Sequence, residues 1–453
     1  MEDFKFTILE DKEMKAISKL IILLLVILSA SLLCIACSDQ KETRSKQAGS
    51  ADSSDSVESG DEADEKEPVT ISVLVHWEED MFNERFKEPI EKRFPHITLE
   101  QVRSGSGQED LEEVFASGTS PDIFFELSQQ TMEYLELDYD LSELIEKHSY
   151  DVSHINPVFL DSIRSKDKEG RLLALPYEII YHVLFYNKDI FDLFGQPYPT
   201  ADMTWSETLE LARNLTGERN GVHYRGLDLG NAETPLQQLA VNKTDPETGE
   251  VLFDQPEFGQ YFDLIDQILD IQGKSDVEAF DQGRFDGDQT TAMVTAFVQG
   301  LNWWKDVEGL NMDVAPLPVW DNGPAVSHRP DGGIIALSIN PESEHKDAAF
   351  DVITYFTENE YQEWASRNGI GPSSSDESVL DQFFQDYEST HDKNVASIFA
   401  HPPATPPEQI SQWDQYVDLD LKRYSESDMD SNEYLRVIEE ESAAKIQDAK
   451  NSQ

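Results

Sequence analysis

Aromatic and acidic side chains follow the first and third apolar segments of the folded part of this chain. Residues 69–75 are rich in β-branched residues and are followed by His76-Trp77-Glu78, and the apolar residues 121–125 are followed by Glu126. A tryptophan face covers the C–H side of a saturated ring, and carboxylates accept paired hydrogen bonds from polar groups. Trp77, Glu78 and Glu126 could therefore line a cleft and recognise a polyhydroxylated ring such as a sugar. Trp77 has an alternative interpretation, in which it covers the hydrophobic core.

The sequence lacks the motifs that hydrolase and metal sites require. The sequence contains neither G-x-S-x-G nor H-E-x-x-H, and its ten histidines show no zinc-ligand spacing. Residues 428–439 are similar to a calcium loop, but Glu433 stands where the sharp turn needs glycine. Carboxylate pairs for glycoside hydrolysis are not diagnostic, because 90 acidic residues make chance pairs inevitable. We expect no catalytic residue, no cofactor and no metal site.

The charge balance also excludes a class of partner. The chain has 35 basic and 90 acidic residues, a formal net charge of −55. Affinity for nucleic acid comes largely from neutralising phosphates with basic side chains, so we expect no nucleic-acid partner. The acidity is typical of a solvated surface that keeps an extracellular protein soluble, and attraction for a cationic ligand is the alternative.

Both cysteines lie near the start of the chain, in a hydrophobic segment. Met14–Cys37 contains Lys15 and Lys19, then an apolar run over residues 20–33, then Ala36 directly before Cys37. The run is shorter than the roughly 20 apolar residues that span a bilayer, so it is typical of a signal peptide. Its end resembles the bacterial lipobox, which implies that Cys37 is lipidated. An ordinary secretory signal with a stray thiol is the alternative.

The segments on either side of the signal peptide have distinct compositions. Residues 1–13 are acidic and unlike the start of a signal, so we expect translation to begin at Met14. Residues 38–68 are polar and acidic with almost no apolar side chains, which predicts a disordered tether. The folded part, from Val69 on, contains no cysteine and can have no disulfide.

Strand and helix patterns alternate along the folded part. Its length exceeds that of one ordinary core and suggests two lobes. Strands alternating with helices predict an α/β fold of parallel β-α-β units with helices on both sheet faces. The C-terminal third, from Lys346, is expected to be mostly helical. The predicted strands are 69–75, 97–102, 121–125, 183–186, 314–317 and 334–338, and the predicted helices are 84–94, 109–116, 205–215 and 258–271.

Six segments, in order, are similar to motifs of family 1 extracellular solute-binding proteins, the group typified by the maltose-binding protein. Each segment alone is weak evidence, but the shared order is specific. Together they run from the middle of the chain towards its C-terminus, and the resemblance covers the chain from Val69 on. The segments are Leu173–Phe191; Pro199-Thr200 with Thr204–Glu207; Met293 with Trp303-Trp304; Ala315–Pro318; Gly332-Gly333 with Ile339-Asn340; and Gly369–Pro372.

The resemblance implies a type II periplasmic-binding-protein fold. Two α/β lobes would be joined by two or three hinge strands, with the ligand in the cleft between them. The expected first lobe comprises residues 69–176 and 315–355, and the expected second lobe comprises residues 177–314 and 356–453. Independently, α/β sheets bind ligands beyond the C-terminal ends of their strands.

The resemblance also suggests further ligand-binding residues. Trp303 and Trp304 resemble the turn that presents a stacking tryptophan, and because they are adjacent we expect one at the ligand and one packed. Trp413 resembles the aromatic residue that the family's C-terminal helices bring to the cleft. Arg329 and Asp331 precede Gly332-Gly333 and are expected to reach the ligand. Tyr177 lies at the crossover, where hinge packing is the alternative.

The function implied is that of a membrane-anchored substrate-binding protein of an ABC importer. It would bind a carbohydrate, present the closed form to the transmembrane permease subunits, and work as a monomer outside the cell, held by the lipid on Cys37. A secreted carbohydrate-active enzyme and a sugar sensor feeding a histidine kinase are the alternatives. A polyamine or metal ligand remains open within the binding class, although such a cleft would be poor in tryptophan.

Overall fold

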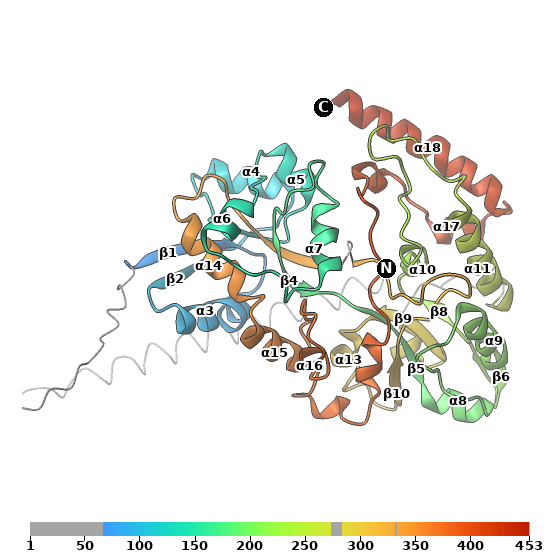
Figure 1. The fold of residues 1–453 in the computed structure, drawn as a ribbon. Helices are drawn as coiled ribbons and strands as arrows, with labels where there is room; N and C mark the ends of the chain where they lie inside the picture. The colour runs from blue at the N-terminus through green and yellow to red at the C-terminus, as the bar shows by residue number, and fades with distance from the viewer. Residues whose placement is uncertain (1–66, 273–282, 331–332, 453) are drawn as a thin grey trace, which may run out of the picture. The chain divides into compact units, whose positions relative to one another are not determined.

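Two separate β-sheets organise the folded part of the chain. The computed structural model describes residues 67–272, 283–330 and 333–452. In the first sheet β1 runs parallel to β2 and β3, while β11 runs antiparallel to β3 and β4 (Figure 1). Its strand order is β2 (Ile97–Val102), β1 (Val69–Leu74), β3 (Ile123–Phe125), β11 (Ile334–Ile339), β4 (Leu175–Ile179).

The second sheet is mostly antiparallel. Its strand order is β10 (Met312–Ala315), β5 (His182–Asn187), β9 (Met293–Phe297), β8 (Asp228–Leu229). A separate hairpin pairs β6 (Gly217–Arg219) with β7 (Val222–Tyr224). The prediction of an α/β fold is correct. The expectation of parallel pairing was wrong for most of this sheet, where only β8 and β9 pair in parallel, because pairing depends on contacts that are distant in sequence.

Alternation along β5 shows how the second sheet is buried. Leu184 and Tyr186 pack into one hydrophobic cluster, while Val183 and Phe185 pack into another. Successive side chains of a strand point to opposite faces, so both faces of this sheet are covered. A strand buried on both sides has a continuous apolar sequence, and residues 183–186 of β5 have one.

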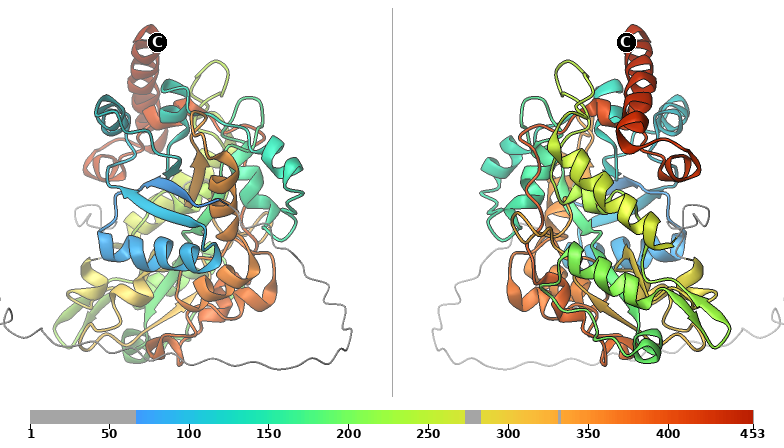
Figure 2. Two further views of the ribbon diagram at one scale, coloured as in Figure 1. Left: turned by 90° about the vertical axis from the view of Figure 1, so that its left-hand side faces the viewer. Right: turned by 90° about the vertical axis from the view of Figure 1, so that its right-hand side faces the viewer.

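Helices cover both sheets (Figures 1 and 2). Those in the first-sheet part are α2 (Glu79–Phe82), η1 (Asn83–Lys87), α3 (Glu88–Arg93), α4 (Gln108–Ala116), α5 (Gln129–Tyr134), α6 (Ser142–Lys147), α7 (Pro157–Arg164), α14 (Lys346–Tyr355) and α15 (Asn359–Arg367). The remaining ones are α8 (Lys188–Phe194), α9 (Trp205–Leu215), α10 (Thr234–Gln237), α11 (Pro256–Gln272), α12 (Gly283–Asp286), α13 (Gly300–Trp303), α16 (Glu377–Leu380), η3 (Glu388–Thr390), η4 (Val395–Phe399), η5 (Gln412–Tyr416), α17 (Leu421–Glu426) and α18 (Ser431–Ser452).

Local sequence explains where α9 begins. Thr204 Oγ1 accepts a hydrogen bond from the Glu207 amide (3.2 Å), and Glu207 Oε2 accepts one from the Thr204 amide (2.9 Å). This reciprocal pair is a capping box, which satisfies backbone donors that have no partner within the helix. The predicted helix over 205–215 therefore has its boundaries where the sequence signals place them.

The chain passes between the sheets at closely spaced points. Only Ile180 and Tyr181 separate β4 of the first sheet from β5 of the second. β10 of the second sheet leads through residues 316–333 to β11 of the first. β4 thus continues three residues beyond the expected lobe boundary at 176, and β10 belongs with the second sheet. Phe356 and Tyr361, expected in the second lobe, pack in the first core.

Two buried histidines join these crossing segments. The rings of His182, at the start of β5, and His328, in the second crossing, stack with centroids 4.4 Å apart. His182 Nδ1 lies 2.8 Å from Thr234 Oγ1, and His328 Nε2 lies 3.1 Å from the Ile180 carbonyl oxygen. Burial, and secondarily the His328 ring, hold the pKa of His182 well below its ordinary value.

Acid should therefore destabilise the fold through His182. In the unfolded chain His182 binds a proton near pH 6.5, whereas in the folded chain it stays neutral at this pH. The free energy of unfolding therefore falls as the pH drops below about 6.5. The contribution is about 1.4 kcal/mol per pH unit for one proton. We expect urea unfolding at several pH values to show the stability gap between wild type and His182→Gln narrowing as the pH falls from 7.5 to 5. A gap independent of pH would contradict this role.

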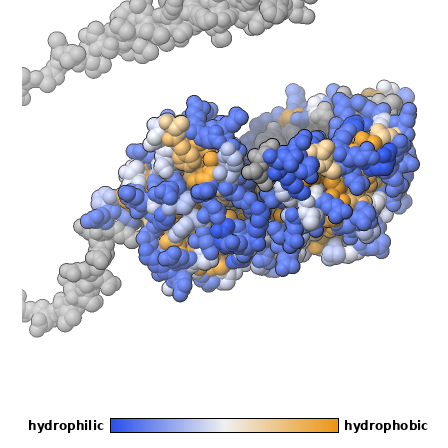
Figure 3. Space-filling model, turned by 90° about the horizontal axis from the view of Figure 1, so that it is seen from above, coloured by the Kyte–Doolittle hydropathy of each residue, from blue (hydrophilic) through white to orange (hydrophobic). Residues whose placement is uncertain are grey.

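The acidic surface predicts that the thermal stability of the protein depends on the salt concentration. Most of the face in Figure 3 is hydrophilic, and a net charge of −55 repels itself in the compact state. At about 1 M salt the screening length falls to roughly 3 Å, so this repulsion is largely removed. We expect the melting temperature to rise between low and high NaCl, and to rise equally in tetramethylammonium chloride of the same ionic strength. A melting temperature that does not change, or that rises with only one salt, would exclude screening as the cause.

Candidate functional site

A cavity of about 790 Å³ lies where the loops after β1, β2 and β3 meet residues 410–415 of the C-terminal part. Because β1, β2 and β3 are parallel, their C-terminal ends lie at one edge of the first sheet, where α/β folds bind ligands. The lining residues are His76, Gly105, Ser106, Gly107, Asp110, Glu126, Leu127, Ser128, Gln129, Gln130, Met132, Glu133, Ile163, Lys166, Leu173, Ala174, Ile334, Ala336, Ile410, Ser411, Gln412 and Gln415.

Glu126 occupies a strained position at the end of β3. Its φ of 58° is left-handed, which non-glycine residues adopt at a cost and which is common at functional sites. Its amide donates to the Ala336 carbonyl of β11 (2.9 Å), which fixes the backbone there. Ser128 then caps α5 by accepting from the Thr131 amide (3.1 Å). The chain therefore turns sharply from strand to helix, with the exposed Glu126 side chain at the cavity.

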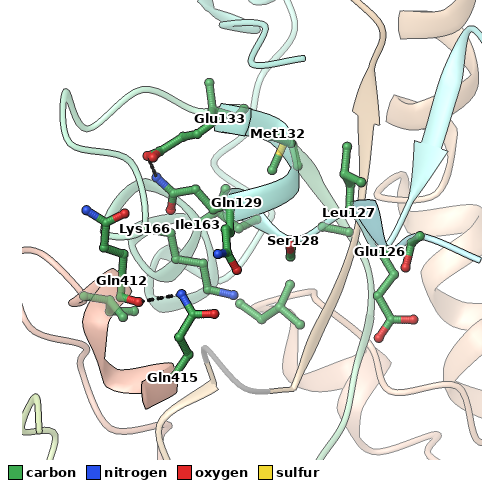
Figure 4. Close-up of a pocket in the computed structure, with 18 of the residues that line it drawn as sticks. Glu126, Leu127, Ser128, Gln129, Met132, Glu133, Ile163, Lys166, Gln412 and Gln415 are labelled. Carbon is green, nitrogen blue, oxygen red and sulfur yellow. Dashed lines mark hydrogen bonds between the residues drawn. The ribbon is translucent and has the colours of Figure 1, made fainter. Parts of the chain in front are cut away.

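The opposite wall is a fixed stretch of the C-terminal part. The Ile410 amide donates to the carbonyl of Ser165, at the end of α7, over 2.7 Å. Asp414 accepts from the amides of Lys243 (3.1 Å) and Thr244 (2.8 Å), and burial raises the pKa of its carboxyl. Figure 4 shows Gln129 and Glu133 of α5, linked by a 2.9 Å hydrogen bond, and Gln412 of η5.

The lining combines apolar side chains with a set of amide and charged groups. It includes the carboxylates of Asp110, Glu126 and Glu133 and the ammonium of Lys166. Its amide side chains are Gln129, Gln130, Gln412 and Gln415. An amide both donates hydrogen bonds to hydroxyl groups and accepts them, whereas a carboxylate accepts them. Among the described residues, the lining has no Trp, Tyr or Phe, and no group of three His, Cys, Asp or Glu is placed to hold a metal ion.

A smaller cavity of about 230 Å³ adjoins the first and shares Ile410 and Gln415 with it. Its wall includes Arg329, whose Nη1 donates to the Val241 carbonyl (3.0 Å). The buried Oε1 of Gln237, another lining residue, has no hydrogen-bond partner among the described atoms. The two cavities together form a polar space that runs from the first sheet to α10.

Trp77 and Glu78, which were proposed from the sequence and follow β1, do not line the larger cavity. Trp77 is half-buried, with its ring centroid 4.7 Å from that of Phe125 and 5.5 Å from that of Phe86. This is the core-covering arrangement given as its alternative. Glu78 is exposed and forms an ion pair with Arg103. Glu126 is the one proposed residue that lines the larger cavity in the described part of the chain.

Tyr177 lies in the first core. Its ring stacks on Phe86 at 5.1 Å and packs edge-on against Phe356 at 5.2 Å. Burial raises the pKa of its hydroxyl well above the ordinary value. Its position corresponds to the hinge-packing alternative.

Trp303 and Trp304 point to different surroundings. Trp304 is 5% exposed and packs 4.9 Å from Phe185, whereas Trp303 is 55% exposed. Gln299, one turn earlier, donates to Glu178 of β4 (3.2 Å), and burial raises the pKa of Glu178. The start of α13 therefore lies beside the first crossing.

The remaining proposed residues have varied positions. Trp413 is buried, with the Lys450 ammonium of α18 4.9 Å from its ring centroid, and it does not line the larger cavity. Arg329 lines the smaller cavity. Asp331 and Cys37 lie outside the described residues.

The glutamines of the lining were missed in the sequence. Gln412 and Gln415 flank Trp413, and a tryptophan is a more distinctive sequence signal than a glutamine. In η5 these neighbours face the cavity while Trp413 faces α18. Gln129 and Gln130 follow the Ser128 cap directly after β3, a strand-to-helix signal that could have pointed to them.

Solved structures share this fold. They include the ABC substrate-binding protein of Listeria monocytogenes in complex with cycloalternan (TM-score 0.63, 19% identity, covering 84% of this chain and 99% of that one). The sugar-binding protein MalE of Xanthomonas citri matches with a TM-score of 0.64 at 18% identity, over 85% and 100% of the two chains. The cyclic α-maltosyl-1,6-maltose binding protein of Arthrobacter globiformis gives 0.66 at 17%, over 83% and 98%. These similarities confirm the predicted two-sheet binding-protein fold.

Comparison of the amino-acid sequence also finds extracellular binding proteins. An arabinooligosaccharide-binding protein of Halalkalibacterium halodurans is 22% identical over 219 residues, which are 45% of this chain. The match spans about half the length of that relative, 48%. A family model described as "Bacterial extracellular solute-binding protein" matches residues 79–363, more than half of this chain. It confirms the resemblance noted in the motifs and identifies a binding protein, not an enzyme. The chain belongs to the family of bacterial extracellular solute-binding proteins.

Proposed function

We propose that this chain is the carbohydrate-binding component of an ABC importer and that it captures an oligosaccharide in the larger cavity. The observation that carries the proposal is the lining: amides and carboxylates converge from the segments that follow β2 and β3 and from η5. The names of similar proteins, which bind arabino-oligosaccharide, cycloalternan or cyclic maltosyl-maltose, support the same ligand class.

In this proposal Glu126 and the glutamines bind sugar hydroxyls. A carboxylate accepts two hydrogen bonds and an amide both donates and accepts, so neighbouring hydroxyls of one ring can be paired in fixed geometry. Trp303 is exposed in α13, outside the lining of both cavities, and in this proposal it supplies an apolar face to the ligand when the two sheets approach each other. Its exposure is otherwise unfavourable for so large a side chain.

Capture involves the crossings between the sheets. The first crossing is only Ile180 and Tyr181, so rotation there moves one sheet with its helices relative to the other. A ligand that touches residues 126–133 and 410–415 together stabilises the arrangement in which these walls are close. The permease subunits would then recognise that arrangement.

The location of the protein is part of the proposal. Lipidation of Cys37 would hold the folded part on the outer face of the membrane through residues 38–68. In the part of the chain that the structure describes, no helix is long and apolar enough to cross a bilayer. Anchoring therefore depends in this proposal on Met14–Cys37, which lies outside the described residues.

Calorimetric titration tests the ligand class. We expect saturable binding with one site per chain for at least one of three ligand sets: linear arabino-oligosaccharides, malto-oligosaccharides and cycloalternan. Amino acids, spermidine and Mn²⁺ serve as contrasting solutes. Saturable binding of a contrasting solute without binding of any saccharide would refute the carbohydrate assignment.

Substitutions at the cavity test its residues. We expect Glu126→Gln to weaken the best saccharide about tenfold or more, because a hydrogen bond to a charged group contributes roughly 1.5–3 kcal/mol. Glu143→Gln, on the exposed face of α6 and outside the lining, is the matched control and should leave the affinity unchanged. Equal affinities for wild type and both variants would show that the ligand binds elsewhere.

Trp303→Ala tests the stacking face separately. A stacked ring contributes apolar contact without a hydrogen bond, so we expect at least a fivefold loss of affinity with little change in melting temperature, because the side chain is largely exposed. Unchanged affinity would remove Trp303 from the site while leaving the assignment of Glu126 intact.

A further inference from the structure

A second groove lies away from the cavity just described. It encloses about 610 Å³, and none of its lining residues lines the larger or the smaller cavity. Three segments form it: the beginning of α9, one face of α11, and residues 320–322 in the crossing between β10 and β11. The lining residues are Trp205, Ser206, Leu209, Pro256, Gly259, Gln260, Asp263, Leu264, Gln267, Trp320, Asp321 and Asn322.

The loop that carries Trp320 is held in place. Trp320 Nε1 donates to the Pro235 carbonyl (3.0 Å), and its ring centroid lies 6.2 Å from that of the buried Trp205. The next residue, Asp321, accepts from Ser206 Oγ over 2.8 Å, which ties the loop to the start of α9. A half-buried aromatic face is thus fixed in the groove beside a carboxylate.

Gly259 keeps the helical wall of the groove open. It is the fourth residue of α11, a helix of 17 residues, and glycine is a poor helix former, second only to proline. Apart from the backbone of α11 itself, no heavy atom of the described residues lies within 4 Å of the position that a Cβ would occupy, so packing against the described part of the chain does not require glycine here. An unfavourable residue that packing does not need, facing open space in a groove, indicates room kept for a ligand.

The chemistry of the lining specifies the ligand class. Aromatic, amide and carboxylate groups are the set that recognises hydroxyl-bearing rings, and no Lys or Arg is among the described lining residues to hold a phosphate or uronate. Gln260, Asp263 and Gln267 recur along one face of α11, and Arg213 donates to Gln267 at its end (3.0 Å). Seven residues of helix span about 10 Å, which exceeds one sugar ring.

We propose that this groove is a second saccharide-binding surface that takes a segment of a neutral polysaccharide chain. It is separate from the interlobe cavity and does not depend on which ligand that cavity binds. A protein that holds a polymer on α9 and α11 would remain beside the source of the oligosaccharides that the cavity captures.

Electrophoresis of the purified protein in native gels that contain soluble starch, arabinan or galactomannan tests the proposal. We expect at least one polymer to retard the wild type. Gly259→Gln should abolish the retardation because it fills the helical wall. It should also preserve or raise the melting temperature, because glutamine is a better helix former than glycine. Asp270→Gln introduces the same side chain in α11 outside the lining and should be retarded like the wild type.

The cavity variant Glu126→Gln separates this proposal from the one above. If the groove binds the polymer, Glu126→Gln is retarded like the wild type, and Gly259→Gln still binds the small saccharide in calorimetry. The proposal is overturned if no polymer retards the wild type, or if Gly259→Gln is retarded normally. It is also overturned if Glu126→Gln abolishes retardation, because the polymer then occupies the cavity.

Discussion

The structure depends on the backbone of Ile179 and Ile180, at the first crossing, which is held against two segments distant in sequence, at Gly333 and at Gly371. The Ile179 amide donates to the Gly371 carbonyl (2.9 Å), and the Ile180 amide donates to the Gly333 carbonyl (2.7 Å). A Cβ on Gly371 would lie 1.8 Å from the Ile179 carbonyl oxygen, and one on Gly333 would lie 2.8 Å from that of Ile180. Backbone carbonyls cannot move aside as side-chain ends can, so only glycine permits this approach.

The backbone contacts at Ile179 and Ile180 determine where the cavity lies. β4 of the first sheet ends, and β5 of the second sheet begins, at this point, so the two sheets are fixed close together there. The loops after β1 and β3 then face residues 410–415 across a short distance, and the Ile410–Ser165 hydrogen bond joins the walls at one end. The crossing between the sheets and the cavity are therefore consequences of one backbone arrangement.

Sequence reasoning succeeded where the signal is local. The helix over residues 205–215, the strand over residues 183–186 and the position of Glu126 after the third strand follow from neighbours within a few residues. It failed where the partner is distant in sequence. Trp77 packs with Phe86, Phe125 and Tyr177, and Trp413 packs with Lys450, and no local pattern distinguishes such packing from exposure in a cleft. The antiparallel pairing of the second sheet was missed for the same reason.

Three buried carboxylates show how so acidic a chain uses its charges. Burial raises the pKa of Glu178, Asp228 and Asp414, so holding each of them ionised opposes folding. Each nevertheless joins segments that are far apart in the sequence. Glu178 accepts from Gln299 (3.2 Å), Asp228 accepts from Thr291 (2.6 Å), and Asp414 accepts from the Thr244 amide (2.8 Å).

Such contacts add little net stability, because desolvation offsets the attraction between the groups. Their effect is on the choice of packing partner. A fold that buried one of these carboxylates against another segment would leave it without its hydrogen bonds and would be far less stable. In a chain whose remaining acidic residues are mostly solvated, these three act as fixed points for β4, β8 and η5. Two of these elements border the cavity or the first crossing, so these carboxylates help to hold the walls of the cavity in position.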